Sequence, residues 1–142
     1  MDNLLVNIKR IGQKVHFEGV SESNPERMIP FDYIPPIGEG DGFAGLELLL
    51  MSFSGCVSTS IVFLIGRMGK HVASYSARAE GIRRESPLSL AKILFHVTVE
   101  SSDLSDADME AVLRQAEQIS PVWHAILNNV EVEMTFSLKA CG

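Results

Sequence analysis

The chain has 142 residues and a formal net charge of −6, with 46% hydrophobic and 21% charged residues. This length suits one hydrophobic core, and we expect a single domain over residues 1–142. Acidic and basic residues are interspersed without a basic stripe, which argues against a nucleic-acid partner. Two cysteines make no disulfide framework, and the N-terminus lacks the zones of a signal peptide. We therefore expect a cytoplasmic protein.

The first elements are expected to be strands. Alternating apolar and polar residues predict one strand over residues 4–9 and a second over residues 14–19. Residues 21–42 are rich in proline, glycine, serine and acidic residues. This composition predicts one long loop, with at most a short strand over residues 28–31.

A long helix is expected next, over residues 44–68. Its apolar side chains recur at steps of three and four, as on one face of a helix: Leu46, Leu49, Leu50, Phe53, Val57, Ile61, Leu64 and Met68. Residues 48–66 carry no charge and are long enough to cross a bilayer. Several hydroxyl side chains interrupt them, so we favour the buried centre of a globular fold over a lone membrane span.

The C-terminal half is predicted to mix strands and helices. Strands are expected over residues 72–84 and 88–100, and Ser105 caps a helix that ends near residue 118. Ser120 followed by Pro121 is typical of a new helix start, here a short helix to residue 127. A last strand is expected over residues 130–138. This order of elements indicates an α+β fold.

Cys56 is the cysteine best placed for chemistry. Free cysteine in an apolar helix is most often a small buried side chain, and a thiol in the middle of a helix gains nothing from the positive helix end. Small residues around it nevertheless leave room beside the sulfur: Ser52, Gly55, Thr59 and Ser60. Cys141 is expected to be exposed near the chain end, unless the last strand brings it close to Cys56.

Neither a metal nor a cofactor is expected. The four histidines are scattered without metal-ligand spacing, and we interpret each as solvated or structural. The glycine-rich residues 38–42 are acidic and do not follow a clear strand, which argues against a phosphate-binding loop.

Two stretches of the chain carry a family resemblance. Residues 42–56 read GFAGLELLLMSFSGC, and Ser120 opens a later Ser-Pro-Val run. Together they resemble the OsmC/Ohr family of osmotically inducible and organic hydroperoxide resistance proteins, and the element order matches over nearly the whole chain. The resemblance implies an intertwined α+β homodimer, in which antiparallel sheets wrap around two long buried central helices with an active site at each subunit boundary.

The resemblance also implies roles for particular residues. In the peroxidase branch, the cysteine that matches Cys56 attacks an organic hydroperoxide, and a second cysteine at the position of Ser120 resolves the product as a disulfide. Serine cannot form that disulfide and suits the role of a helix cap instead.

An arginine and a glutamate complete the family's peroxidase site by activating the first thiol. Arg10 and Arg27 are our candidates for the arginine, which the family takes from the N-terminal part. The family's glutamate lies ten residues before the cysteine, where this chain has Leu46. Glu47 is the alternative, although it lies on the opposite face of an ideal helix from Cys56.

Two hypotheses follow. The first, which we favour slightly, is a one-cysteine thiol peroxidase, in which an organic hydroperoxide oxidises Cys56 and an external thiol or Cys141 reduces it. The second is a redox-inert dimer of the same fold that binds a small apolar ligand. The retained Cys56 favours the first, whereas Ser120 favours the second. In the first reading, aromatic residues are candidates to line a pocket beside the thiol: Phe43, Phe53, Phe63 and Trp123.

Overall fold

The computed structural model describes residues 1–141 and divides into two compact units, Met1–Leu48 and Leu49–Gly142. The long helix α1 (Gly45–Arg67) begins in the first unit and continues in the second. Its bounds lie within one residue of those expected from the apolar pattern.

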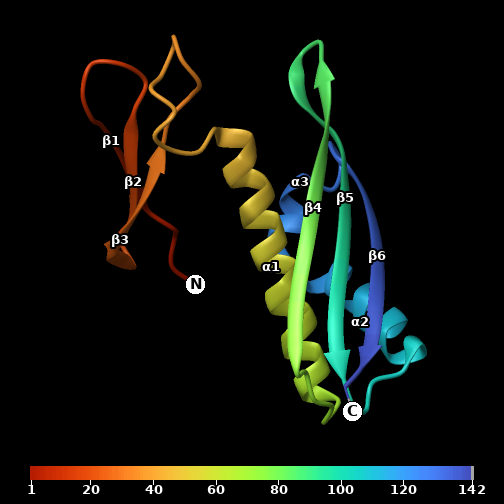
Figure 1. Cartoon of the computed structure of the whole chain (residues 1–142). Helices are drawn as coiled ribbons and strands as arrows, with labels where there is room; N and C mark the ends of the chain where they lie inside the picture. Colours follow the sequence, from red (N-terminus) through yellow and green to blue (C-terminus); the bar gives the residue numbers. More distant parts are fainter. Residues whose placement is uncertain (142) are drawn as a thin grey trace. The chain divides into compact units, whose positions relative to one another are not determined.

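The N-terminal unit contains an antiparallel three-stranded sheet, in the order β1 (Val6–Arg10), β2 (Phe17–Ser21) and β3 (Asn24–Phe31) (Figure 1). The prediction of a loop up to residue 28 was wrong, because β3 occupies eight residues. Pro25 and Pro30 had argued against a strand. They are tolerated because β3 is at the edge of its sheet, where a residue without a backbone N–H interrupts no central ladder.

The glycine-rich segment after β3 folds around Asp32, a side chain that is 5% exposed. Its carboxylate accepts hydrogen bonds from the backbone N–H groups of Tyr33 at 2.7 Å, Glu39 at 3.2 Å and Asp41 at 3.0 Å. A Cβ atom at Gly38 would lie 2.2 Å from Oδ1 of Asp32, so only glycine allows this approach. The N–H groups of this segment therefore point at a carboxylate of the chain itself.

The C-terminal unit contains a second three-stranded sheet, in the order β4 (Ser74–Glu85), β5 (Leu88–Ser101) and β6 (Glu131–Ala140). β4 and β5 are antiparallel, whereas β5 and β6 are parallel. The expectation of purely antiparallel sheets was therefore wrong for this sheet. Helices α2 (Asp106–Ile119) and α3 (Pro121–Ile126) form the crossover that returns the chain to the same end of the sheet.

The core of the C-terminal unit lies between its sheet and its helices, which cover one face of the sheet (Figure 1). The alternation expected in β5 is confirmed, because Ile93, Phe95, Val97 and Val99 are buried. Phe53 of α1 packs edge-on against Phe95, with ring centroids 5.6 Å apart. This packing fixes the side of α1 that faces the sheet.

Only part of α1 is covered within the single chain. Its buried residues lie on one side of the helix: Phe53, Val57, Ser60, Ile61 and Ile65. Met51, Val62 and Phe63 are 48%, 42% and 56% exposed, respectively. Among the residues described, α1 is also the one helix long and apolar enough to cross a membrane by length and composition, with 28% of its apolar window buried.

Candidate active site around Cys56

Cys56 lies in the middle of α1 and is half-buried. Val57 beside it is fully buried, whereas Gly55 on its other side is exposed and has no atom within 4 Å of the place where a Cβ would lie. The thiol is thus at the border between the buried and the exposed sides of the helix. A small molecule can reach a thiol at such a position, whereas it cannot reach the thiol of a cysteine buried in the core.

One helical turn after Cys56, two buried hydroxyl groups meet. Oγ of Ser120 lies 2.9 Å from Oγ of Ser60 and 2.5 Å from the carbonyl oxygen of Ala116. The Ser60 hydroxyl in turn donates to the carbonyl oxygen of Cys56 at 3.3 Å. These contacts connect the backbone of Cys56 to the end of α2, through side chains that are 8% and 0% exposed.

The structure corrects the expected role of Ser120 as a side-chain cap. Ser120 does occupy the N-cap position of α3, with Pro121 following, but its hydroxyl makes no capping hydrogen bond. The hydroxyl instead bonds to the preceding helix and to α1. Sequence patterns at helix starts predict the position of a cap. They do not predict that the Ser120 side chain bonds to Ser60, sixty positions earlier.

A further hydroxyl contact near Cys56 was missed by the sequence reasoning. The Tyr75 hydroxyl on β4 donates to Oγ of Ser58 on α1 at 2.7 Å. Burial raises the pKa of Tyr75 above its usual value, and the hydrogen bond with Ser58 partly opposes this shift. Tyr75 therefore remains a neutral hydrogen-bond donor at physiological pH. The strand alternation around Tyr75 could have indicated an inward side chain, but not its partner.

The aromatic residues expected around the thiol have different positions. Phe53 is fully buried and packs on Phe95 and on Trp123, whose ring centroid is 5.4 Å away. It belongs to the core and lines no open pocket. Phe63 is exposed, with the Arg67 guanidinium 5.8 Å from its ring centroid. Phe43 lies in the N-terminal unit, where it forms a bridge with Phe31.

Three predicted site residues lie in the N-terminal unit. Glu47 accepts a hydrogen bond from the backbone N–H of Ala44 at 3.0 Å and so stabilises the start of α1. Nε of Arg10 donates to the carbonyl oxygen of Lys14 at 2.9 Å, across the turn between β1 and β2. Arg27 is exposed on β3. The prediction that any of them approaches Cys56 stays a prediction.

Cys141 is half-buried and not frayed, contrary to expectation. Its backbone N–H donates to the carbonyl oxygen of Ser101 at 3.4 Å, and the Ser101 hydroxyl donates to the carbonyl oxygen of His71, just beyond the end of α1. Cys56 precedes that helix end by eleven residues, or about 16 Å along the axis. A disulfide needs Cα atoms within about 7 Å. Cys141 is therefore too far from Cys56 to pair with it inside one chain.

The histidine on β5 is structural, in agreement with the sequence analysis. Nδ1 of His96 lies 2.7 Å from Oγ1 of Thr135, and Nε2 lies 3.0 Å from Oγ of Ser137. Both ring nitrogens are thus used in cross-strand contacts with β6. No group of three or more potential metal-ligating side chains occurs in the part of the chain that the structure describes.

The pattern of residues around Cys56 matches a known family. The family model of OsmC-like proteins matches residues 38–135, a region that includes both Cys56 and Ser120. The chain belongs to this family. No curated protein matches it at a significant level.

Solved structures of OsmC-like and related proteins share the fold. A hypothetical protein from Aquifex aeolicus superposes with a TM-score of 0.84 at 16% identity, covering 100% of both chains. An OsmC-like protein from Mycoplasma pneumoniae gives 0.83 at 13% identity, covering 97% of this chain and 98% of its own. An organic hydroperoxide resistance protein from Elizabethkingia anophelis gives 0.73 at 16% identity, covering 98% of both. Together they show that this chain has the OsmC-like fold.

Proposed function

We propose that this OsmC-like protein is a one-cysteine thiol peroxidase that reduces organic hydroperoxides at Cys56. The observation that carries the proposal is the half-buried position of this thiol, at the border between the buried and the exposed sides of α1. The family includes organic hydroperoxide resistance proteins, such as the structural neighbour from Elizabethkingia anophelis. Cys56 is also the thiol that the family resemblance assigns to peroxide attack.

The chemistry of the first step needs only the thiolate and the peroxide. The Cys56 sulfur attacks one peroxide oxygen, an S–O bond forms, and the O–O bond breaks. The sulfur becomes a sulfenic acid, and the released alkoxide takes up a proton and leaves as an alcohol. The two electrons that reduce the peroxide come from the sulfur.

The second step needs an external thiol. Ser120 stands at the position that the family resemblance assigns to a resolving cysteine, and the contacts of Cys141 lie beyond the end of α1, about three helical turns from Cys56 of the same chain. A small thiol therefore condenses with the sulfenic acid, releasing water and forming a mixed disulfide. A second thiol then attacks the mixed disulfide, which regenerates the Cys56 thiol and releases the disulfide of the two external thiols.

We further propose that the protein is a homodimer that buries the exposed side of α1. Small or β-branched residues recur along this side at steps of three and four, including Gly55, Thr59, Val62 and Gly66. Such a surface allows two helices to approach closely, and the exposed apolar side chains of Met51 and Phe63 would be covered. The roles proposed for Arg10, Arg27 and Glu47 would then be filled across the subunit boundary.

A second function is favoured by one observation. The Ser120 hydroxyl is completely buried and hydrogen-bonded to Ser60, so the side chain at this position has a structural role. A redox-inert protein of the same fold that binds a small apolar ligand would have this feature. In that case Cys56 would oxidise no faster than an ordinary thiol.

The experiment that separates the two functions follows peroxide consumption. Reduced protein is mixed with cumene hydroperoxide and dithiothreitol, with the Cys56→Ser and Cys141→Ser variants alongside. The proposal expects turnover that Cys56→Ser abolishes and Cys141→Ser preserves. Consumption equal to that of dithiothreitol alone would reject the peroxidase function and leave the ligand-binding one.

A further inference from the structure

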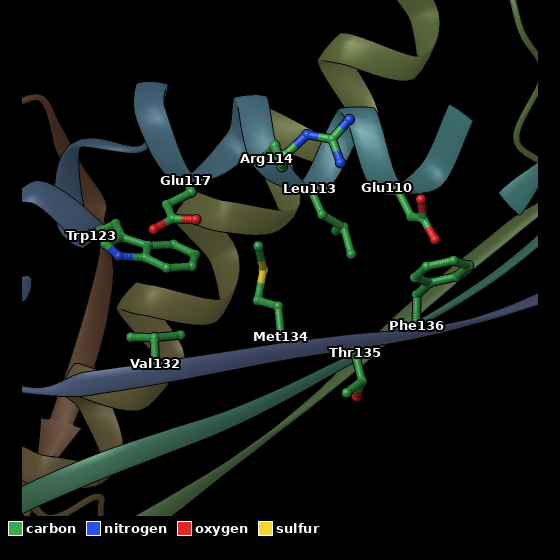
Figure 2. Close-up of a pocket in the computed structure, with 9 residues that line it drawn as sticks. All are labelled: Glu110, Leu113, Arg114, Glu117, Trp123, Val132, Met134, Thr135 and Phe136. Atoms are coloured by element: carbon green, nitrogen blue, oxygen red, sulfur yellow. The ribbon is translucent and has the colours of Figure 1, made fainter. Parts of the chain in front are cut away.

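We propose that the free edge of β6 binds an extended peptide whose apolar residues alternate with basic ones. The site is independent of Cys56 and of the proposed peroxidase. It lies in the C-terminal unit between β6, α2 and α3, where a hollow of about 550 Å³ opens (Figure 2).

The floor of this hollow is apolar. Val132, Met134 and Phe136 of β6 point toward α2, and Leu113 of α2 points back toward them (Figure 2). Trp123 of α3 lines the same hollow. The three β6 side chains are half-buried and not fully covered, so the hollow can still gain apolar contacts.

The hollow also borders the edge of the strand. Thr135 points away from α2, yet it lines the same hollow as its neighbours Met134 and Phe136 (Figure 2). Consecutive strand residues face opposite sides of a sheet, so a hollow that contacts all three reaches around the strand edge. Among the described residues, β6 pairs with β5 alone. Its other edge therefore offers backbone N–H and C=O groups to an added strand.

Charge indicates the kind of peptide. Glu110 and Glu117 lie exposed at the rim with Arg114 between them, which leaves an excess of negative charge. On the opposite face of β6, Glu131 and Glu133 have side chains that are 73% and 58% exposed, and Lys92 is their ion-pair partner, at 3.8 and 3.4 Å. A strand added beside β6 would place every second residue next to the carboxylates of Glu131 and Glu133. The residues between them would lie in the apolar hollow. Lysine or arginine would suit the positions next to the carboxylates, and valine-like residues would suit the positions in the apolar hollow.

The test uses Trp123, the single tryptophan of the chain, as a fluorescence reporter. The full-length protein is titrated with a capped hexapeptide of alternating lysine and valine. A peptide of alternating glutamate and valine is the charge control, and a peptide with three lysines followed by three valines is the order control. We expect saturable binding of the alternating basic peptide, at least about tenfold tighter than either control.

A charge-reversal variant makes the test specific to this edge. The double variant Glu131→Lys with Glu133→Lys replaces two exposed residues on the face of β6 where the basic residues of the peptide would lie, and circular dichroism checks its fold. We expect the preference to reverse toward the acidic alternating peptide. A second variant, Met134→Ala, trims the apolar floor and is expected to weaken the basic peptide several-fold.

Three results would overturn the proposal. Equal binding of the alternating and block peptides would indicate charge attraction without strand addition. An unchanged preference in the folded double variant would place the peptide elsewhere. A tryptophan signal that changes with protein concentration and not with peptide would show that a second copy of the chain covers this edge.

Discussion

The hydroxyl of Ser120 lies 2.9 Å from that of Ser60, in the interior between α1 and the junction of α2 and α3. Ser120 stands at the position that the family resemblance assigns to the resolving cysteine of the peroxidases. Ser60 lies four residues after Cys56, on nearly the same side of α1. In the proposed one-cysteine peroxidase, Cys56 would therefore act beside a buried hydrogen bond and without a resolving thiol at position 120.

The hydroxyl pair is expected to stabilise the fold. Ser120→Ala leaves the buried Ser60 hydroxyl without one partner, which costs about 1–3 kcal/mol of unfolding free energy. Urea denaturation measures this loss. In the double variant Ser60→Ala with Ser120→Ala the loss is expected to be smaller than the sum of the two single losses. Ser52→Ala, an exposed hydroxyl on the same helix, is the control and should change stability by less than about 0.5 kcal/mol.

A cysteine introduced at position 120 should form a disulfide with Cys56. In Ser120→Cys, a thiol replaces the hydroxyl that contacts Ser60, the residue one helical turn after Cys56, and oxidation of Cys56 by cumene hydroperoxide should lead to a bond between the two sulfurs. Mass spectrometry would show the loss of two hydrogens from the reduced variant. The double variant Cys56→Ser with Ser120→Cys should show no such loss. A sulfenic acid at Cys56 that persists beside the introduced thiol would mean that the two positions cannot meet.

The exposed side of α1 can be tested through Gly55. Gly55 is exposed and a Cβ atom there would meet nothing within 4 Å in the single chain, so Gly55→Leu should leave the fold intact and obstruct a second helix. Light scattering without detergent should give twice the chain mass of 15.6 kDa for the wild type. The variant should dissociate at a concentration at least about tenfold higher.

A matched control for this variant is Ala107→Leu, which adds the same side chain on an exposed position of α2. It should leave the dimer unchanged. A monomeric wild type, or equal masses for the two variants, would contradict the proposed dimer. A wild type that requires detergent would instead support a membrane-bound α1.

Acid should loosen the loop around Asp32. The hydrogen bond from the N–H of Asp41, with those from Tyr33 and Glu39, lowers the pKa of Asp32 below 3.8, although burial opposes part of the shift. A lowered pKa in the folded state means that the stabilisation is present above about pH 4 and is lost as the pH falls through the folded-state value.

The measurement for Asp32 is the unfolding free energy at pH 7 and at pH 3. The wild type should lose more stability over this interval than Asp32→Asn, which has no charge to lose. Asp2→Asn, which removes an exposed carboxylate near the N-terminus, should follow the wild type. An identical decline in all three proteins would show that Asp32 does not carry the acid dependence.

The elements with strong local signals were predictable from the sequence. The apolar repeat predicted α1 within a residue at each end, and Ser105 closes a capping box at the start of α2 as expected. β3 was predicted only as a possible short strand over its last four residues, because the composition suggested a loop; the edge position that tolerates its prolines is a property of the sheet. The parallel pairing of β6 also depends on the path of the α2–α3 crossover, which local pattern does not reveal.

The candidate site was predictable only in part. Local patterns singled out Cys56 and Ser120, and the family resemblance gave their expected roles, whereas their environment depends on contacts distant in sequence. The Ser60–Ser120 pair spans sixty positions and the Tyr75–Ser58 contact joins a strand to a helix. Neither contact can be predicted from local residue patterns, because serine and tyrosine also occur at exposed positions without such partners.

The most direct test of the peroxidase function compares the two cysteines of one molecule. Both thiols are half-buried, so Cys141 serves as an internal reference for Cys56. Reduced protein is mixed with substoichiometric cumene hydroperoxide, sulfenic acid is trapped with dimedone, and the two cysteine peptides are quantified by mass spectrometry. The proposed function predicts label almost entirely on Cys56, at least about a hundredfold above Cys141. Equal labelling of the two cysteines would contradict it.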